Sequence, residues 1–250
     1  MTEPFYQTIV LIVKGAFSGL GLKIDVVGEE NIPLVGGAIL AINHTSYLDF
    51  ALGGIPANRR GRRLVRFMAK DSIFRHKIAG PLMRGMKHIP VDRDAGSQAF
   101  RDSVAALKSG EIVGVFPEAT MSRSLDIKGI KSGTIRMARV AKVPVLPMII
   151  FGGHRILSYG VKDFTRGRCA IIMVGEPLDI DGDPEEGNYR LREALRELLV
   201  QAVERYPDKV LGASWLPARL GGSAPTLEEA EVIEVAAQLE RTAKRAQKKS

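Results

Sequence analysis

Cysteine is almost absent from this chain, and so are long uninterrupted apolar runs. Cys169 is the single cysteine in 250 residues, which excludes an intramolecular disulfide framework and is typical of a reducing compartment. No window holds about 18 uninterrupted apolar residues, so the sequence predicts no conventional membrane-spanning helix. The N-terminus also lacks the basic region, apolar core and small-residue cleavage site of a secretory signal.

Aromatic residues are also scarce, at 6%, although the formal net charge is +8. A basic balance favours nucleic acid, anionic lipid, or a phosphorylated or acidic partner. The densest basic run, residues 59–66, holds five arginines with no interleaved aromatic side chain, so it lacks the stacking surfaces of a nucleic-acid-binding module. We expect no nucleic-acid partner and keep that class as the less favoured alternative. The run is either a solvated face or a surface for an anionic partner.

Metal-ligand spacing is missing as well. The four histidines (His44, His76, His88 and His154) show no ligand spacing with cysteine or with paired carboxylates. We therefore expect no metal and no prosthetic group. The chain is long enough for one sizeable α/β domain, and its hydrophobic fraction of 45% is normal for a globular protein.

Short apolar runs alternate with helical patterns along the chain. This alternation predicts an α/β fold with a mixed, partly parallel central sheet flanked by helices. The expected strands are residues 37–43, 64–69, 89–91, 111–116, 143–151 and 170–174, and the expected helices are 97–108, 132–141 and 188–205, with a further helix through 48–52 capped by Ser46. Pro144 and Pro147 predict that the strand at 143–151 is an edge or irregular strand.

The two ends of the chain differ in composition from the middle. Residues 1–22 are apolar but interrupted by polar side chains, which predicts an N-terminal helix that either lies in a membrane interface or packs on the domain; we favour the interface. Residues 23–216 would form the α/β domain. Residues 217–250 would form a linker and a basic C-terminal helix, which begins at a Thr226–Glu229 capping box and ends as a solvated tail or a contact for anionic lipid.

The most informative residues are His44 and Asp49, which lie five positions apart where a strand gives way to a helix. On one ideal helix they would point roughly 140° apart, so they can meet only if His44 precedes the helix and Asp49 lies in its first turn. Asp49 would then accept from one imidazole nitrogen, and the other nitrogen would be free to take a proton from an alcohol. Backbone amides near the helix start are candidates for oxyanion stabilisation.

A structural interpretation of the same residues is also open. Asp49 follows Ser46 by three positions, so the two residues can simply form a capping pair, with His44 as an ordinary loop histidine. The string His-x-x-x-x-Asp is common by chance.

Four sequence motifs, which we call blocks, occur in a fixed order and favour the catalytic interpretation of His44 and Asp49 over the structural one. They are Asn43-His44 with Asp49, the apolar-x-apolar-x-Arg string at residues 89–93, Phe116-Pro117-Glu118-Ala119-Thr120-Met121, and the Pro-rich apolar run at residues 143–147. This arrangement resembles the glycerolipid acyltransferase family that includes bacterial 1-acyl-glycerol-3-phosphate acyltransferase. The resemblance spans roughly residues 36–151.

The resemblance implies transfer of a fatty acyl group from acyl-CoA or acyl carrier protein to a glycerol hydroxyl, with lysophosphatidate as acceptor and phosphatidate as product. No Gly-x-Ser-x-Gly elbow occurs, and no covalent acyl-enzyme is required. No cofactor beyond the thioester co-substrate is implied. The enzyme would sit on the cytoplasmic face of the cell membrane, as a peripheral or monotopic protein on an anionic surface. Another lyso-lipid or a glycolipid is the alternative acceptor.

The site residues follow from the matched blocks. His44 and Asp49 would be catalytic. Arg93 would bind phosphate, since guanidinium matches phosphate bidentately, and Glu118 with Thr120 would line the acceptor site. The chain departs from the family at Lys87 and Ala119, where most members have Gly, and at Met121, where most have Arg. Arg123, two residues on, would replace that lost arginine, and Lys128 or Lys131 lies nearby in sequence as a further cation for the substrate.

Overall fold

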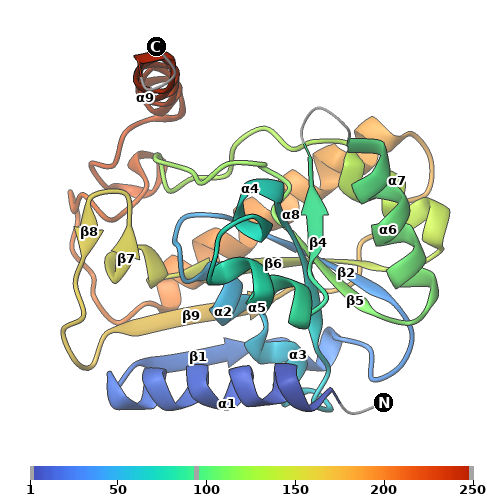
Figure 1. Cartoon of the computed structure of the whole chain (residues 1–250). Coiled ribbons are helices and arrows are strands. Elements are labelled where there is room, and N and C mark those ends of the chain that lie inside the picture. Colours follow the sequence, from blue (N-terminus) through green and yellow to red (C-terminus); the bar gives the residue numbers. More distant parts are fainter. Residues whose placement is uncertain (1–2, 93–95, 248–250) are drawn as a thin grey trace.

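Seven strands form the central sheet in this computed structural model, which describes residues 3–92 and 96–247 (Figure 1). Their order across the sheet is β1-β9-β6-β2-β5-β3-β4, and only the β6–β9 pair is antiparallel. The strands are β1 (Lys23–Val27), β2 (Ala38–Ile42), β3 (Val65–Lys70), β4 (Ile89–Val91), β5 (Ile112–Val115), β6 (Val145–Phe151) and β9 (Cys169–Val174). The mixed, mostly parallel sheet confirms the predicted fold class. A separate small hairpin pairs β7 (Leu157–Ser158) with β8 (Val161–Lys162).

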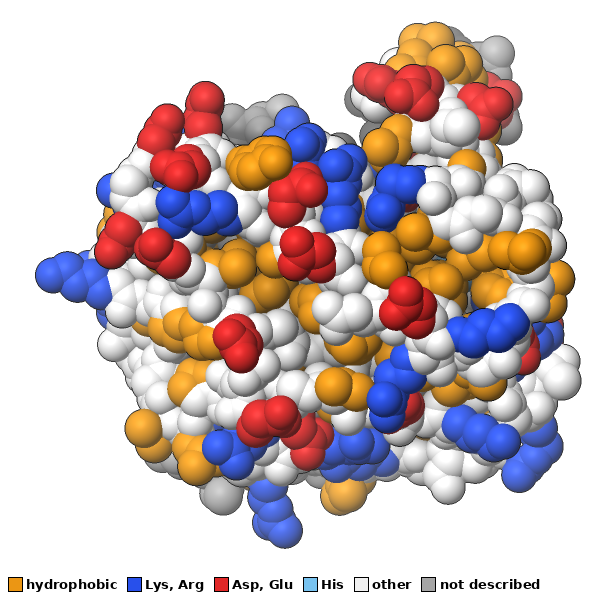
Figure 2. Space-filling model, turned by 180° about the vertical axis from the view of Figure 1, so that it is seen from behind, with side chains coloured by type: hydrophobic (Ala, Val, Ile, Leu, Met, Phe, Trp, Pro, Cys, Tyr) orange, Lys and Arg blue, Asp and Glu red, His pale blue; other side chains and the backbone are white. Residues whose placement is uncertain are grey.

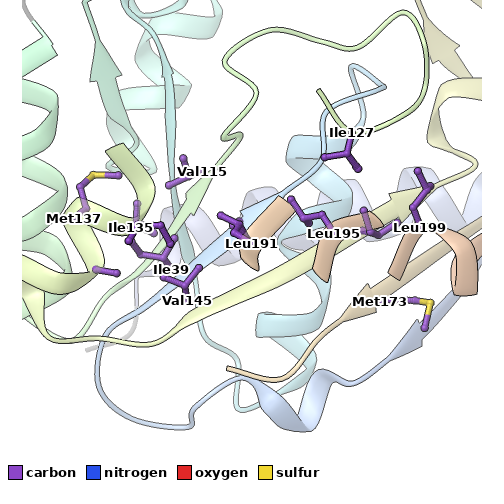
Figure 3. Close-up of a cluster of buried hydrophobic side chains, with 14 of the residues drawn as sticks. Ile39, Val115, Ile127, Ile135, Met137, Val145, Met173, Leu191, Leu195 and Leu199 are labelled. Carbon is purple, nitrogen blue, oxygen red and sulfur yellow. The ribbon is translucent and has the colours of Figure 1, made fainter. Parts of the chain in front are cut away.

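Helices cover both faces of the sheet. One face packs against α6 (Gly96–Lys108), α7 (Gly133–Ala141) and α8 (Pro184–Arg205), and Figure 3 shows Leu191, Leu195 and Leu199 of α8 in this cluster. The other face packs against α1 (Pro4–Gly19), α2 (Asp49–Gly53) and α3 (Ile55–Arg59). The short helices α4 (Asp71–Phe74) and α5 (Ala79–Gly85) connect β3 to β4, and single 3-10 turns lie at Glu29–Asn31, Gly153–Arg155 and Ala218–Leu220.

Strand β2 is buried along its whole length. Its sequence is a continuous apolar run, as expected for a parallel strand with helices on both faces. Ile39 and Ala41 join the cluster under α8, while Leu40 and Ile42 join the opposite cluster. At the end of the strand, the Asn43 side chain donates to the carbonyl of Ile150 at 3.2 Å and accepts from its N–H at 2.7 Å. The amide therefore extends the pairing by one residue before the chain leaves the sheet.

Strand β6 contradicts the prediction of an edge or irregular strand. It lies in the interior of the sheet between β2 and β9, and all seven of its residues are buried. Pro144 precedes the strand, and the last β9 residue, Val174, pairs with Met148. The carbonyl of Pro147 accepts from Gly175 beyond the end of β9, at 2.8 Å. The nitrogen of Pro147 faces that same side and has no N–H, so the proline omits one return hydrogen bond just where the β9 ladder ends.

The N-terminal helix α1 is packed on the domain along one side and exposed along the other. The Tyr6 hydroxyl donates to the carbonyl of Val65 at 2.8 Å, and Phe17 is buried in the core. Leu11 and Ile12 are 68% and 61% exposed. Across the described residues, no helix has the length and hydropathy needed to cross a membrane.

The C-terminal helix α9 (Leu227–Gln247) projects from the body of the molecule (Figure 1). The predicted capping box is confirmed, because Thr226 Oγ1 accepts from the N–H of Glu229 at 3.2 Å and the Glu229 carboxylate accepts from the N–H of Thr226 at 2.8 Å. Acidic side chains are visible on this helix in Figure 2. The same view shows basic and acidic side chains interspersed over the back of the molecule, without a single basic patch.

The arginine run at residues 59–66 is partly turned into the protein. Arg66 is 4% exposed and forms ion pairs with Glu3 at 2.5 Å and Glu111 at 2.7 Å. Arg63 donates to the carbonyls of Pro33 and Gly36, at 2.7 Å each. These two arginines hold the N-terminal region and neighbouring loops together, so they are not free to form part of an open anionic-partner surface.

Candidate active site

His44 lies in the loop between β2 and α2, as its position before the helix predicts. Its ring stacks on Phe116, the first residue after β5, with ring centroids 4.3 Å apart and an interplanar angle of 26°. Because β2 and β5 are parallel neighbours, their carboxyl ends meet at one edge of the sheet and bring these two rings together. The stacking restricts the imidazole to one orientation.

Asp49 is the first residue of α2, and its side chain is fully buried. Its Oδ2 lies 2.9 Å from His44 Nδ1 and also accepts from the N–H groups of Thr45 and Ser46, at 2.8 Å each. Burial raises the pKa of the Asp49 carboxyl, and the three donors on Oδ2 oppose that rise. An acceptor on Nδ1 places the ring proton there, which leaves Nε2 as the atom that can take a proton.

The structure contains both arrangements that the sequence left open. The predicted His44–Asp49 contact is present, and Asp49 also accepts from Ser46 N–H in the manner of a capping box. The prediction that Ser46 caps the helix by its side chain is wrong, because Ser46 Oγ accepts from Leu48 N–H at 3.0 Å, ahead of the helix. The local turn of residues 46–48 uses that hydroxyl.

The N–H groups of residues 44–49, which lead into the helix start, are already hydrogen-bonded. The N–H of His44 donates to Glu118, those of Thr45 and Ser46 donate to Asp49, and that of Tyr47 donates to the carbonyl of Leu157. The N–H groups of Leu48 and Asp49 both donate to Ser46. These amides hold the loop in shape, so the prediction of an oxyanion donor near the helix start now falls on the next N–H groups, those of Phe50 and Ala51 in the first turn of α2.

Glu118 joins the His44 loop to a second loop. Its Oε1 accepts from the N–H of His44 and its Oε2 accepts from the N–H of Lys128, at 3.1 Å each. Glu118 is 5% exposed, and burial raises the pKa of its carboxyl to about 7 against the pull of these two amides. Both oxygens of Glu118 therefore accept from backbone amides and hold the two loops together.

A mostly apolar cavity of about 340 Å³ opens at the His44 ring. We call it the His44 cavity. It is lined by apolar side chains from β3, α4, β5 and α7, including Met68, Ile73, Phe116 and Met137. Lys131 also lines it and at the same time borders a neighbouring, more polar cavity of about 780 Å³. We call the second one the Lys128 cavity; Glu118, Thr120 and Lys128 are among its lining residues.

Lys128 and Lys131 differ in how they are engaged. Lys128 Nζ donates to Thr120 Oγ1 at 2.7 Å and to both carboxylate oxygens of Glu234 in α9, at 2.9 and 3.1 Å. Lys131 has no ion pair with a carboxylate in the described part of the chain, and its N–H donates to the carbonyl of Pro117 at 3.0 Å. Lys131 is thus a cation available beside the His44 cavity, and so is Lys70, which lines the same cavity and has no ion pair among the described residues.

The remaining predicted site residues are not all brought together. Arg93 lies outside the described residues. Arg123 does not line the His44 cavity or the Lys128 cavity, and its guanidinium lies over the ring of Tyr159 at 4.0 Å from the centroid. Met121 is only 4% exposed, so this position packs in the interior and presents no group to a substrate.

The two departures from glycine have a common conformational cost. Lys87 and Ala119 have φ angles of 55° and 61°, in the left-handed region that glycine adopts most readily. Sequence reasoning missed the stacking role of Phe116, although this residue stands in the third block. Its position directly after a strand parallel to β2 was the available signal.

The described residues contain no group of three or more His, Cys, Asp and Glu side chains suited to a metal ion.

Comparisons with known proteins agree with this geometry. The chain is 28% identical over 191 residues to the 1-acyl-sn-glycerol-3-phosphate acyltransferase of Bacillus subtilis, covering 75% of this chain and 89% of the relative. It is 27% identical over 194 residues to the protein of the same name from Borreliella burgdorferi, covering 74% and 73%.

A solved structure is similar over most of the chain. The crystal structure of the 1-acyl-sn-glycerophosphate (LPA) acyltransferase PlsC from Thermotoga maritima matches with a TM-score of 0.65 and 26% identity, covering 81% of each chain. The family model named Acyltransferase matches residues 23–151, more than half of the sequence. This range contains the strand ends that carry His44 and Glu118, together with the start of α2 at Asp49. The chain therefore belongs to the Acyltransferase family.

Proposed function

We propose that this chain transfers a fatty acyl group from a thioester to the free hydroxyl of 1-acyl-glycerol-3-phosphate, giving phosphatidate for phospholipid biosynthesis. The observation that carries the proposal is the His44 ring, held by Asp49 at 2.9 Å on Nδ1 and lining a mostly apolar cavity. The names of the relatives from Bacillus subtilis and Borreliella burgdorferi support the choice of acceptor.

His44 acts as a general base in this reaction. Nε2 removes the proton of the acceptor hydroxyl as its oxygen attacks the thioester carbonyl, and Asp49 stabilises the resulting imidazolium. The tetrahedral intermediate then breaks its C–S bond, and the proton held by His44 passes to the departing sulfur. The new ester bond forms directly between donor and acceptor. Positioned proton transfer of this kind contributes about 10²–10⁴-fold to the rate.

The surroundings of the ring suit the two ends of the acceptor. Apolar side chains of the His44 cavity accommodate hydrocarbon, and Lys131 stands where this cavity meets the polar Lys128 cavity. A glycerol phosphate group is only a few bonds from the reacting hydroxyl, so its counter-charge must be close to His44. Lys131 meets this condition, and Arg93 remains a proposed phosphate ligand from the sequence.

The donor and the location are finer parts of the proposal. The donor is acyl-CoA or acyl carrier protein, and no cofactor beyond that thioester is needed. The enzyme works at the cytoplasmic face of the membrane as a peripheral or monotopic protein. The exposed apolar residues Leu11 and Ile12 on α1 support contact with a lipid surface.

One observation favours a variant with a different acceptor. Met121 is buried at the position where most members of the family carry arginine, and Arg123 lines neither the His44 cavity nor the Lys128 cavity. A lyso-lipid with another head group, or a glycolipid, would depend less on that missing cation.

Product analysis decides between these acceptors. Purified protein is offered acyl-CoA with a panel of lyso-lipids of different head groups, and the products are identified by mass spectrometry. We expect phosphatidate from 1-acyl-glycerol-3-phosphate as the dominant product. A faster reaction with another head group would establish the variant, and no transfer to any hydroxyl would contradict both.

A further inference from the structure

A third cavity, of about 410 Å³, shares no lining residue with the His44 cavity or the Lys128 cavity. We call it the Arg123 cavity. Its walls come from the loop around Arg123, the segment from His154 to Arg168, and the turn that holds Trp215, and Thr45 also lines it. Apart from Arg123, which the sequence offers as a replacement for the lost arginine, neither the motifs nor the proposed reaction uses this part of the molecule.

The charge of the Arg123 cavity favours an anion. Its lining contains Arg123, Arg155 and Arg168 but a single carboxylate, Asp163. Arg168 is paired with Asp163, and Arg155 is paired with Asp208. The Arg123 guanidinium rests on the ring of Tyr159 and has no carboxylate partner within residues 3–92 and 96–247. It is therefore a positioned cation without a counter-ion.

Arg168 Nε has no hydrogen-bond partner among the described residues, and neither do two polar atoms of more deeply buried lining residues. They are Thr45 Oγ1 and His154 Nδ1, on side chains of residues that are 4% and 3% exposed. His154 Nε2 lies 2.9 Å from the carbonyl of Trp215, which can only accept, so Nε2 carries the hydrogen and Nδ1 is an acceptor. Burial lowers the pKa of His154 to about 4, which keeps the ring neutral. Buried polar atoms normally have partners, so these two leave hydrogen-bonding capacity unused in the residues that line the cavity.

The walls of this cavity are tied to the loop that carries His44. Ser122, next to Arg123, donates its N–H to the carbonyl of His44 at 2.7 Å. Thr45 follows His44 directly, and the ring of Tyr47 lies 5.9 Å from that of Tyr159. A ligand in the Arg123 cavity is thus adjacent to the catalytic loop but is not in contact with the cavity at the His44 ring.

This separation distinguishes the two substrates of the proposed reaction. The phosphate of the acceptor is a few bonds from the reacting hydroxyl and has to stay close to the ring. The phosphates of coenzyme A are separated from the thioester sulfur by the long pantetheine arm, so their counter-charge belongs at a distance from the ring.

We propose that the Arg123 cavity binds the phosphorylated nucleotide end of an acyl-CoA donor, with Arg123 as its anion ligand. The choice of donor rests on the acyl-transfer function proposed above. Arg123 then determines affinity for the donor, in contrast to the role in acceptor binding that the sequence predicts for it.

Binding and kinetics on the full-length protein test this proposal. The affinities of coenzyme A, adenosine 3′,5′-bisphosphate, glycerol 3-phosphate and inorganic phosphate are measured by calorimetry for the wild type and R123Q. We expect R123Q to raise the Kd of coenzyme A and of the bisphosphate about tenfold or more, since a charge-assisted contact is lost. The KM for acyl-CoA should rise similarly, and the KM for the lyso-lipid should stay unchanged.

A matched control and a second variant complete the test. Arg136 also lies over an aromatic ring, that of Phe100 at 5.7 Å, but does not line this cavity, so R136Q should bind coenzyme A like the wild type. T45V removes the unpartnered hydroxyl while keeping the side-chain shape and should weaken coenzyme A severalfold. T45V provides the test of the site if R123Q does not fold.

Three results would overturn the proposal. They are an unchanged coenzyme A affinity in both variants, a rise in the lyso-lipid KM instead of the acyl-CoA KM, or equally tight binding of glycerol 3-phosphate, which would indicate a lipid head-group site. If coenzyme A binds in an Arg123-dependent manner but no acyl group is transferred, the proposed coenzyme A site is supported and the proposed acyl-transfer function is contradicted. If R123Q transfers the acyl group normally with an unchanged KM for acyl-CoA, the acyl-transfer function is supported and the coenzyme A site is contradicted.

Discussion

The buried carboxylate of Glu118 accepts the backbone N–H of His44 at 3.1 Å, so the loop that carries the candidate base rests on a group that resists ionisation. Burial raises the pKa of Glu118 to about 7 from an ordinary value of 4.5. The folded protein therefore binds this proton more tightly than the unfolded chain does, between roughly pH 4.5 and 7. The stability that results is fully present below pH 4.5 and is lost as the pH rises through 7.

Glu118→Gln should remove this pH dependence. From the raised pKa, the free energy of unfolding of the wild type should fall by at most about 3 kcal/mol between pH 5 and pH 8. Urea unfolding at both pH values measures it, and the wild type should lose more stability over this interval than the variant does. Glu176→Gln, at an exposed carboxylate, is the control and should keep the wild-type profile. Parallel pH profiles for the wild type and Glu118→Gln would show that Glu118 titrates normally.

Asp49→Asn should slow turnover without unfolding the protein. An amide can still accept at its oxygen from the Thr45 and Ser46 N–H groups, but it no longer fixes the charged form of the His44 ring. We expect kcat to fall on the order of 10³-fold with little change in either KM. Steady-state kinetics and a thermal melt measure both effects. A tenfold or smaller loss in a folded variant would mean that Asp49 serves the helix start alone.

Lys131→Gln should weaken binding of the phosphorylated acceptor. Lys131 borders both cavities near His44 and has no ion pair with a carboxylate in the described residues. Loss of its charge should raise the KM for 1-acyl-glycerol-3-phosphate about tenfold and leave the KM for acyl-CoA unchanged. Lys162→Gln, on the exposed strand β8, is a charge-matched control. An unchanged acceptor KM would exclude Lys131 from the phosphate site.

Ile12→Glu should reduce recovery of the protein with anionic phospholipid vesicles. Ile12 is 61% exposed on α1, so the substitution leaves the buried contacts of Tyr6 and Phe17 intact. Sedimentation with vesicles gives the bound fraction, and the melting temperature should stay the same. Val35→Glu, at a loop residue that is 84% exposed, should bind vesicles like the wild type. Equal sedimentation of all three proteins would make α1 a structural helix only.

Local patterns in the sequence were sufficient for most elements of the sheet. The apolar run of β2 and the turn signals around it predict a buried strand, and the Thr226–Glu229 spacing predicts the cap of α9. The interior position of β6 could not be predicted, because it depends on where β9 ends relative to Pro147. Pairing between distant segments is not encoded in either segment alone.

The candidate site was predicted in part for the same reason. The contact between His44 and Asp49 is local, so their spacing was enough to constrain it. Which cationic side chains stay available to a ligand is not a local property. Arg66 forms ion pairs with Glu3 and Glu111, and Lys128 forms one with Glu234. A cationic residue can bind a ligand only if no carboxylate from a distant part of the chain already pairs with it. Such pairs can be identified only once the fold is known.

The most direct test of the whole account is the turnover of His44→Ala with acyl-CoA and 1-acyl-glycerol-3-phosphate. The variant keeps the backbone contact to Glu118 and should fold, and His76→Ala, at an exposed histidine outside the His44 cavity, is its matched control. We predict that kcat of His44→Ala falls by at least about 10³-fold while His76→Ala remains near the wild type. A folded His44→Ala protein that transfers the acyl group at a near-normal rate would contradict the central claim that this imidazole removes the hydroxyl proton.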